Sequence, residues 1–304
     1  MINWKTYNQE LIKRGEILIE RDFFSAEQNK TKKRPGRPKE YPDSLIIFTL
    51  IIKFLTRFAY RQLQGYLSSL FAGSGFKVPN FRTIHYRFKK LAQILESQII
   101  DFDSLPDNFV IAIDATGLKL YNREEWNRKK HKRRSRKGWI KIHVAVDVES
   151  KQLVDVKITQ DNVHDSKMAI PIVEGVVEKA QSKGKKLEKV FADKGYDTHE
   201  IFNKLKQKGI VAGIIPRKSA RIRGDSARDR VVRKLRRMGI RKYKEEIGYG
   251  KRNVVENFFS VFKRRFGEYV DSRKWENIRA EIMFKVFIVN SFKRGCLWSR
   301  ELKV

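Results

Sequence analysis

The chain has 304 residues, of which 41% are hydrophobic, so it is long enough for one large domain or two smaller ones with their own cores. It carries 67 Lys and Arg against 35 Asp and Glu, and the resulting net charge of +32 predicts a polyanionic partner because it would otherwise cost self-repulsion. The single cysteine, Cys296, excludes a disulfide framework and any zinc site built on cysteine pairs.

Nucleic acid is a better candidate for this partner than an anionic membrane. The most apolar run, residues 45–55, contains Lys53 and is much shorter than the roughly 20 residues that a membrane-spanning helix needs. Residues 1–21 are charged throughout and lack the apolar segment of a signal peptide. We therefore expect no membrane partner and a location in the cytoplasm, in association with the nucleoid.

The N-terminal part of the chain predicts a helical segment followed by a linker. Residues 1–29 have a loose apolar face at helical spacing, whereas residues 30–41 are basic and broken by Pro and Gly. Within this linker, residues 34–38 read Arg-Pro-Gly-Arg-Pro and have the centre of an AT-hook, in which Arg37 would enter an A·T-rich minor groove. A flexible basic linker is an equally weighted alternative.

Residues 42–105 have helical periodicity and predict an all-α domain of the helix-turn-helix type. Three helices are expected, at about residues 42–55, 60–71 and 80–95. The third helix combines apolar anchors with basic side chains, among them Arg82 and Arg87, as a helix in the major groove of DNA would. A plain helical bundle with a solvated basic face is the alternative.

From about residue 106 the pattern changes to β-type apolar runs that later alternate with helices. Strands are expected at residues 109–114, 139–148, 153–158, 189–193 and 210–215, and helices at residues 166–183, 199–208 and 254–265. Three strands in a meander followed by alternating helices and strands predict an α/β domain over residues 106–270, with a mixed sheet flanked by helices. One further helix is expected in a C-terminal segment, residues 271–304.

Two basic stretches interrupt the predicted sheet domain. Residues 123–141 carry ten Lys and Arg against two Glu, and residues 217–244 carry thirteen against two Asp. A run of charge is usually a solvated face, but two such runs in one domain with acidic strand ends favour a channel for double-stranded DNA. Lys132, Arg133 and Arg134 are the candidate DNA contacts in the first stretch.

Two acidic residues stand at the ends of apolar runs. Asp114 ends Val-Ile-Ala-Ile-Asp and Asp193 ends Val-Phe-Ala-Asp, and a carboxylate beside so much apolar surface is costly unless a cation pairs with it. Because ligands of open α/β sheets bind at the carboxyl ends of the strands, these two acids can converge on one site. Structural acids that pair with an Arg at the strand ends are the alternative.

Glu256 is the third candidate, because a pair of Mg²⁺ ions needs several oxygen ligands. Within the predicted helix, Arg252 and Lys263 fall within roughly 40° of Glu256, and Tyr249 lies about 20° to its other side if the helix extends so far. Cations spaced in this way could hold DNA phosphates on either side of a bound metal. An ordinary ion pair of Glu256 with Arg252, four residues before it, is the alternative.

These residues resemble the motifs of the DDE transposases of bacterial and archaeal insertion sequences, in the families numbered four and five, and most closely family five. The resemblance rests on residues 113–117, 162–166 and 191–197, and on the spacing of Tyr249, Arg252, Glu256 and Lys263. It implies an RNase H-like catalytic domain in which Asp114, Asp193 and Glu256 bind Mg²⁺, with Mn²⁺ as a substitute. It also implies that Tyr249, Arg252 and Lys263 contact DNA.

The function that this resemblance implies is DNA transposition. Such an enzyme binds the terminal inverted repeats of its element, pairs two ends as a homodimer or larger assembly, cleaves the 3′ ends and joins them to target DNA. His164 and Asp165 would lie near the metals, although Asp165 could instead cap the helix that begins at Ser166. His143 is interpreted as a core or surface histidine rather than a ligand.

Two other classes of function stay open at this point. A domesticated DNA-binding protein would keep the basic helices without cleaving DNA. A nuclease with the RNase H fold would need the three acids but would hydrolyse DNA without strand transfer.

Overall fold

The structure is a computed structural model that describes residues 3–6, 8–9, 12, 40–75, 77–98, 100, 102–120 and 138–294. Most of the predicted N-terminal helix and linker, including Arg37, therefore lies outside the described residues, as do Lys132, Arg133 and Arg134. The chain divides into two compact units, residues 1–99 with 272–304, and residues 100–271. None of the described helices is long and apolar enough to cross a membrane.

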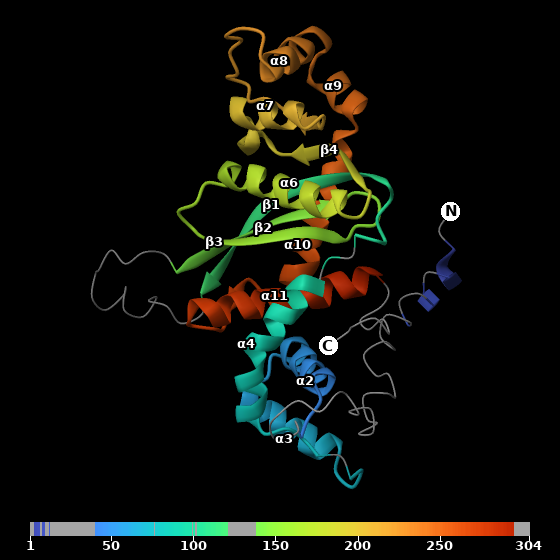
Figure 1. Cartoon of the computed structure of the whole chain (residues 1–304), viewed down its shortest axis with the longest axis vertical. Helices are drawn as coiled ribbons and strands as arrows, with labels where there is room; N and C mark the ends of the chain where they lie inside the picture. The colour runs from blue at the N-terminus through green and yellow to red at the C-terminus, as the bar shows by residue number, and fades with distance from the viewer. Residues whose placement is uncertain are drawn as a thin grey trace, which may run out of the picture. The chain divides into compact units, whose positions relative to one another are not determined.

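The first unit is helical (Figure 1). Its helices α2 (Asp43–Thr56), α3 (Tyr60–Leu70) and α4 (Phe81–Gln98) agree with the three predicted ones to within three residues at each end. Helix α2 ends at Arg57, whose left-handed backbone (φ 60°) turns the chain toward α3. Most of α2 is buried, because other helices surround an apolar sequence that shows no single hydrophobic stripe.

A fourth helix, α11 (Trp275–Arg294), completes the core of this unit from the C-terminal end of the chain. Phe284 of α11 stacks on Phe88 of α4 with ring centroids 5.4 Å apart, and its ring is 5.7 Å from that of Phe54 in α2. The sequence predicted the helix but placed it in a segment of its own. Its packing partners are distant in the sequence, so helical periodicity alone does not identify them.

The second unit is built on a mixed sheet. The strands β1 (Asn108–Leu120), β2 (Trp139–Asp147) and β3 (Leu153–Gln160) form an antiparallel meander. On the other side of β1, β4 (Lys186–Ala192) and β5 (Val211–Ile214) add in parallel. The resulting order is β3-β2-β1-β4-β5, and the short β6 (Tyr269–Val270) pairs with the end of β1. This order and these directions are those of the RNase H-like fold, which confirms the predicted fold class.

Helices cover both sides of the sheet (Figure 1). Helix α6 (Ser166–Gln181) packs against β3 and β4, and α10 (Asn253–Phe266) packs against β1 and β2. Side chains alternate between the two faces along a strand. Ile111 and Ile113 belong to the core shared with α6, so Asp114 points to the opposite face of β1.

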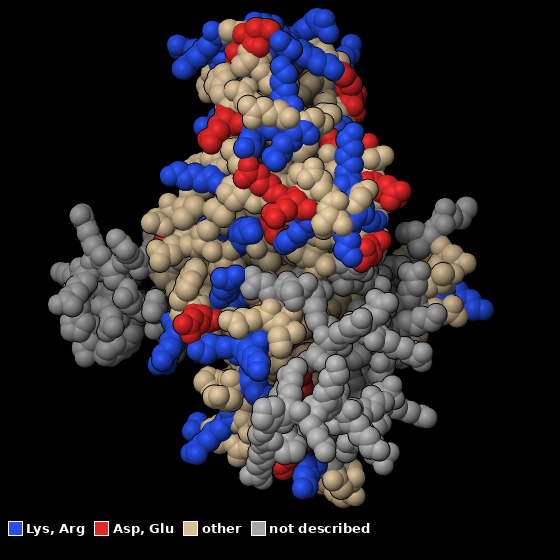
Figure 2. Space-filling view, viewed as in Figure 1, with Lys and Arg blue, Asp and Glu red and all other residues tan. Residues whose placement is uncertain are grey.

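One stretch folds more regularly than its sequence predicted. Residues 217–244 were interpreted as a basic low-complexity patch, but they contain α8 (Ala227–Met238) and most of α9 (Ile240–Ile247). Ser226 caps α8, since its Oγ accepts a hydrogen bond from the backbone N–H of Asp229 at 3.1 Å. Lys and Arg side chains gather over α8 and α9, with Asp and Glu among them (Figure 2). The apolar residues of these helices recur at helical spacing, a pattern that the prediction overlooked among the many Lys and Arg: Val231, Leu235 and Met238 in α8, and Ile240, Tyr243 and Ile247 in α9.

Candidate active site

The first acid lies within a strand rather than at its end. Strand β1 continues past Asp114 to Leu120, where it pairs with β2 and β6. The side chain of Asp114 is 25% exposed, and its Oδ1 accepts a hydrogen bond from the backbone N–H of Ala115 at 2.8 Å. Three residues further on, Gly117 leaves room for the ring of Trp139, because a Cβ at Gly117 would lie 3.0 Å from it. Trp139 thus has a packing role on β2.

The second acid is level with the first. The parallel register pairs Ala112 with Phe191, so Asp114 and Asp193, each two residues further on, lie at the same height in the sheet. Asp193 directly follows β4 and caps a 3₁₀ turn, η4 (Lys194–Tyr196). Its Oδ1 accepts a hydrogen bond from the backbone N–H of Gly195 at 2.7 Å, and a Cβ at Gly195 would lie only 2.8 Å from that oxygen. A side chain at this position would therefore displace the carboxylate of Asp193.

The third acid lies in the first turn of α10. The α-helix does not extend back to Tyr249; a 3₁₀ turn, η5 (Tyr249–Arg252), precedes it. The Nη2 of Arg252 pairs with Glu256, and its Nη1 is 3.5 Å from Oδ2 of Asp114. The structure thus contains the ion pair that a purely structural interpretation predicts. Arg252 also contacts Asp114, and an ordinary ion pair between Arg252 and Glu256 does not explain that second contact.

The three acids interact electrostatically. Burial is the main reason that the pKa of Asp114 is raised to about 6. The N–H of Ala115 and the charge of Arg252 lower this pKa, whereas the charges of Asp193 and Glu256 raise it. Carboxylates within this range of one another repel when all are ionised, so the site favours a bound cation. In the structure that cation is the guanidinium of Arg252.

The donor atoms of the site suit a hard divalent ion. Carboxylate oxygens without thiolate or imidazole are the ligands of Mg²⁺ and Mn²⁺. Within the described part of the chain, no group of three or more His, Cys, Asp or Glu side chains is close enough together to hold a metal ion as it stands. The guanidinium of Arg252 lies between Asp114 and Glu256, and the acids do not form the compact three-acid cluster that the resemblance implies.

A fourth acid and a tyrosine lie close to the site. The Nζ of Lys141 on β2 donates to Oδ1 of Asp165 at 3.0 Å and to the carbonyl of Val163 at 2.8 Å. Asp165 makes no capping hydrogen bond at the start of α6, so the interpretation of its side chain as a helix cap is wrong. The hydroxyl of Tyr196 is buried and bonds to no described residue; its pKa is raised by burial and by nearby acids, Asp114 foremost. Tyr196 lies within the motif at residues 191–197 and Lys141 ends the first basic stretch, but neither was predicted as a site residue, because a lone Tyr or Lys carries no spacing signal.

The two histidines near these elements have different surroundings. His143 is fully buried, its Nε2 is 2.8 Å from Oγ1 of Thr159, and burial lowers its pKa to about 4. These features suit a neutral core histidine, as expected from the sequence. His164 is exposed, and its Nδ1 is 2.7 Å from Oγ of Ser166 at the start of α6.

Tyr249 and Lys263, the other predicted DNA contacts near Glu256, both have partners within the unit. The hydroxyl of Tyr249 donates to the carbonyl of Ala192 at 3.3 Å, and the guanidinium of Arg252 lies 5.7 Å from its ring centroid. Tyr249 thereby ties η5 to the end of β4. Lys263 lies at the far end of α10, where its Nζ is 3.6 Å from Oε1 of Glu268.

The two basic residues predicted on the third helix differ in accessibility. Arg82 is exposed at the start of α4. Arg87 pairs with Asp43 and donates to the carbonyl of Tyr41 at 2.6 Å, with its side chain only 13% exposed. Arg82 is thus free to reach a ligand, whereas Arg87 joins α4 to the start of α2.

The region that holds these acids matches a known family. A family model described as "Transposase DDE domain" matches residues 106–291, which is more than half of the chain. The chain belongs to the DDE transposases. A second model of the same description matches residues 12–123 of this DDE transposase. Asp114, Asp193 and Glu256 all lie within the first match.

Individual relatives of this DDE transposase are distant. An uncharacterized protein of Aquifex aeolicus (strain VF5) is 28% identical over 246 residues, which are 77% of this chain and 71% of that protein. The cryo-EM structure of the piggyBac transposase synaptic complex with hairpin DNA is 10% identical, covers 93% of this chain and 74% of its own, and has a TM-score of 0.45.

The crystal structure of the Mos1 mariner paired end complex with Mn is 12% identical, covers 84% of this chain and 86% of its own, and has a TM-score of 0.25. We infer nothing about the chemistry of this chain from structures with such low identities and TM-scores.

Proposed function

We propose that the protein binds the terminal inverted repeats of an insertion sequence and catalyses metal-dependent cleavage of the 3′ ends and their transfer into target DNA. The observation that carries this proposal is that Asp114 and Glu256 share the guanidinium of Arg252, while Asp193 lies level with Asp114 and raises its pKa. One arginine needs only one acid to form an ion pair, whereas three acids from two neighbouring strands and one helix are present here. They match the ligand chemistry of an enzyme that works on phosphodiester bonds.

Asp114, Asp193 and Glu256 are the residues that would hold the divalent cations, Mg²⁺ or Mn²⁺. Bound between carboxylates and a phosphodiester, such ions help to deprotonate the attacking water or 3′-OH and offset the charge on the leaving oxygen. The residues of the chain supply the positions. Gly195 fixes the carboxylate of Asp193, and the backbone of Ala115 fixes that of Asp114.

Arg252 is the residue that changes partners in this proposal. It pairs with two of the acids, and its buried Nε bonds to no described residue. A phosphate presents oxygens to a guanidinium much as a carboxylate does. We expect Arg252 to release Asp114 and Glu256 when DNA binds and to hold a backbone phosphate beside them.

Double-stranded DNA is the proposed partner, both as transposon ends and as target. Arg82 and Lys263 are proposed contacts, together with the basic residues outside the described part of the chain, Arg37, Lys132, Arg133 and Arg134. Two ends must be held at once for joining, so a homodimer or larger assembly is proposed on DNA. We also propose that the protein acts in the cytoplasm, in association with the nucleoid.

The experiment is a cleavage and joining assay with the purified full chain, a duplex that carries the terminal repeat with its flank, and a target plasmid. With Mg²⁺, the wild type is expected to cut the 3′ end and join it to the plasmid, and Asp193→Asn is expected to do neither. Glu188→Gln is the matched control, because it removes the charge of an exposed acid on the same strand, β4.

The outcomes of this assay separate the alternatives. Cleavage without joined product under all conditions would favour a nuclease of the RNase H fold. Specific binding of the ends without cleavage by the wild type would favour a DNA-binding protein. Equal activity of the wild type and Asp193→Asn, or activity that persists when a chelator removes divalent metal, would refute the proposed mechanism.

A further inference from the structure

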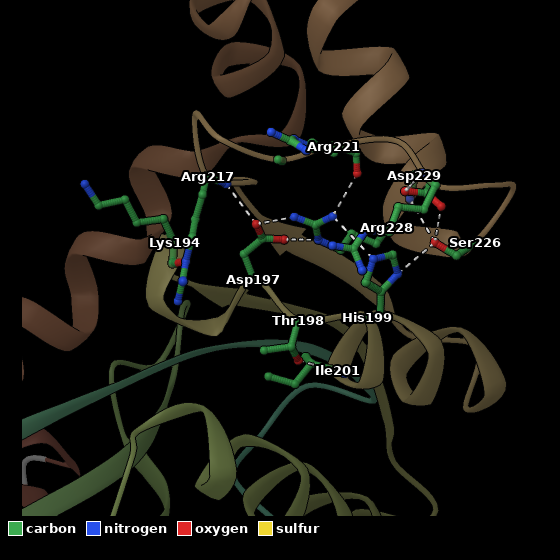
Figure 3. Close-up of polar contacts among 12 residues, drawn as sticks. Lys194, Asp197, Thr198, His199, Ile201, Arg217, Arg221, Ser226, Arg228 and Asp229 are labelled. Atoms are coloured by element: carbon green, nitrogen blue, oxygen red, sulfur yellow. Dashed lines mark hydrogen bonds and ion pairs between the residues drawn. The ribbon is translucent and has the colours of Figure 1, made fainter.

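A basic pocket lies next to the turn that carries the second acid (Figure 3). Its volume is about 370 Å³, large enough for a phosphate group with part of its sugar. Six of the residues that line it are charged or titratable: Asp197, His199, Arg217, Arg221, Arg223 and Arg228. They come from the turn after Asp193, the start of α7 (His199–Gln207), the loop after β5, and α8.

The only acid among these residues is already neutralised. Both oxygens of Asp197 accept hydrogen bonds from Arg228, from Nε at 2.6 Å and from Nη2 at 2.8 Å. One of them also accepts the backbone N–H of Arg217 at 2.9 Å. The side chains of this pair are 0% and 9% exposed, so the pair is a wall of the pocket rather than a surface contact. The other lining arginines leave the pocket positively charged.

Two of these arginines have side chains that no described residue binds. The guanidinium groups of Arg221 and Arg223 are exposed, and no hydrogen bond or ion pair joins them to any residue within the described ranges. Their backbones, in contrast, are anchored. The carbonyl of Arg221 accepts Nη1 of Arg228 at 3.5 Å, and the N–H of Arg223 donates to Asp229 at 3.3 Å. Anchored backbones with free guanidinium groups are suited to bind an anion from solvent.

The pocket is joined to the catalytic turn through Arg217 (Figure 3). Its Nε donates to the carbonyl of Lys194 at 3.1 Å and its Nη2 to that of Gly195 at 3.3 Å. The N–H of Gly195 holds the carboxylate of Asp193. Four residues of chain span at most about 14 Å, so the Cα atoms of Asp193 and Asp197 are no further apart than that.

We propose that this pocket binds a backbone phosphate of the DNA near the bond that is cut. Arg221 and Arg223 are the phosphate ligands, and the pair of Asp197 with Arg228 holds the loop that presents them. This inference rests on the proposed function, because it takes DNA to be the substrate. The pocket adds a phosphate contact to a region of the chain that the family motifs do not include.

The experiment is a phosphate-neutralisation scan with the full chain. In a set of duplexes that carry the terminal repeat, single phosphates are replaced one at a time by uncharged methylphosphonates, and the Kd of each is measured. The wild type is expected to lose affinity at one or two positions near the cleavage site. The double variant Arg221→Gln with Arg223→Gln is expected to bind the normal duplex more weakly and to show no further loss at those positions.

A control variant removes the same charge elsewhere. Arg230→Gln with Arg241→Gln changes two exposed arginines of α8 and α9, whose side chains pair with Asp225 and Glu245 and do not line the pocket. This variant is expected to keep the sensitivity of the wild type. All four arginines are exposed, so folding is retained; the two single variants at Arg221 and Arg223 provide an independent repetition of the scan.

The failure of this inference differs from the failure of the proposed function. If the double variant keeps the neutralisation profile of the wild type, or if no phosphate near the cleavage site matters to the wild type, the pocket does not bind DNA phosphate while cleavage and joining persist. If the wild type neither binds the terminal repeat nor cuts it, the proposed function is wrong, and the inference about the pocket is wrong as well because it takes DNA to be the substrate.

Discussion

At the scale of single residues, Asp114 is placed for chemistry at a cost to stability. Its pKa is raised from 3.8 to about 6, so the folded state binds the proton more tightly than the unfolded state does. The ionised carboxylate therefore destabilises the fold at pH 7, by on the order of 3 kcal/mol, and this penalty is absent below the unfolded pKa. Catalytic residues often have pKa values that are shifted by burial and by neighbouring charges.

We therefore predict that Asp114→Asn raises the free energy of unfolding at pH 7, by up to about 3 kcal/mol, without metal present. The gain should shrink as the pH falls through 6 and vanish below about 3.8, where the wild-type carboxyl is protonated in both states. Urea denaturation of the wild type and the variant at pH 7, 5 and 3.5 measures this difference. A variant less stable than the wild type at pH 7 would contradict the account of Asp114.

The ionisation of His143 affects the pH dependence of stability in the opposite direction. Burial lowers its pKa from 6.5 to about 4, so its neutral form belongs to the folded state, and protonation at lower pH opposes folding. Its contribution is complete above pH 6.5 and is lost as the pH falls toward 4. We predict that the stability of His143→Gln relative to the wild type rises between pH 7 and pH 4. A difference that stays constant over this range would mean that His143 does not titrate as its burial indicates.

Asp193 and Glu256 were predicted from local patterns, an apolar run and the spacing along one helix. It did not identify the second contact of Arg252, because Asp114 is 138 residues away. Tyr196 and the pair of Asp197 with Arg228 were missed for the same physical reason. Their partners meet only in the folded chain, and no periodicity connects them.

At the scale of elements, the helical unit depends on a helix from the far end of the chain. Phe284 of α11 is fully buried against rings from α2 and α4. Because its ring packs against Phe54 and Phe88, we predict that Phe284→Ala lowers the free energy of unfolding of this unit by about 3–5 kcal/mol. Thermal or urea denaturation monitored by far-UV circular dichroism measures the loss.

Tyr86→Ala is the control for this substitution. Tyr86 lies on α4 and is 85% exposed, so removal of its ring should change stability by no more than about 0.5 kcal/mol. Equal effects of the two variants would show that α11 does not contribute a core to the unit.

Elements with a strong apolar period were the most predictable. Helix α10 and the strands of the sheet agree with their predicted positions, although β1 extends six residues beyond Asp114 to Leu120. Helices α8 and α9 were not predicted, although their apolar residues recur at helical spacing, because these residues stand among many Lys and Arg. Arg228 and Asp229 are buried in α8, although charged residues are expected to be exposed.

At the scale of the whole molecule, the net charge of +32 predicts binding dominated by phosphate contacts. The logarithm of the affinity for terminal-repeat DNA should fall steeply and linearly with the logarithm of the salt concentration. Six or more phosphate contacts would weaken binding by about a thousandfold or more between 50 and 200 mM salt. Fluorescence anisotropy at several salt concentrations gives the slope, and an affinity that is insensitive to salt would exclude a DNA channel.

The central claim is that Asp114, Asp193 and Glu256 together hold divalent cations. Titration with Mn²⁺ of the full chain bound to a terminal-repeat duplex tests it directly, because Arg252 is expected to release the acids when DNA binds. The free ion is followed by electron paramagnetic resonance, and the Mn²⁺ bound by the duplex alone is subtracted. The wild type and Glu188→Gln are predicted to bind Mn²⁺ alike, and Asp193→Asn and Glu256→Gln to bind it at least about tenfold more weakly. Equal binding of Mn²⁺ by the wild type and by both of these acid variants would contradict the claim.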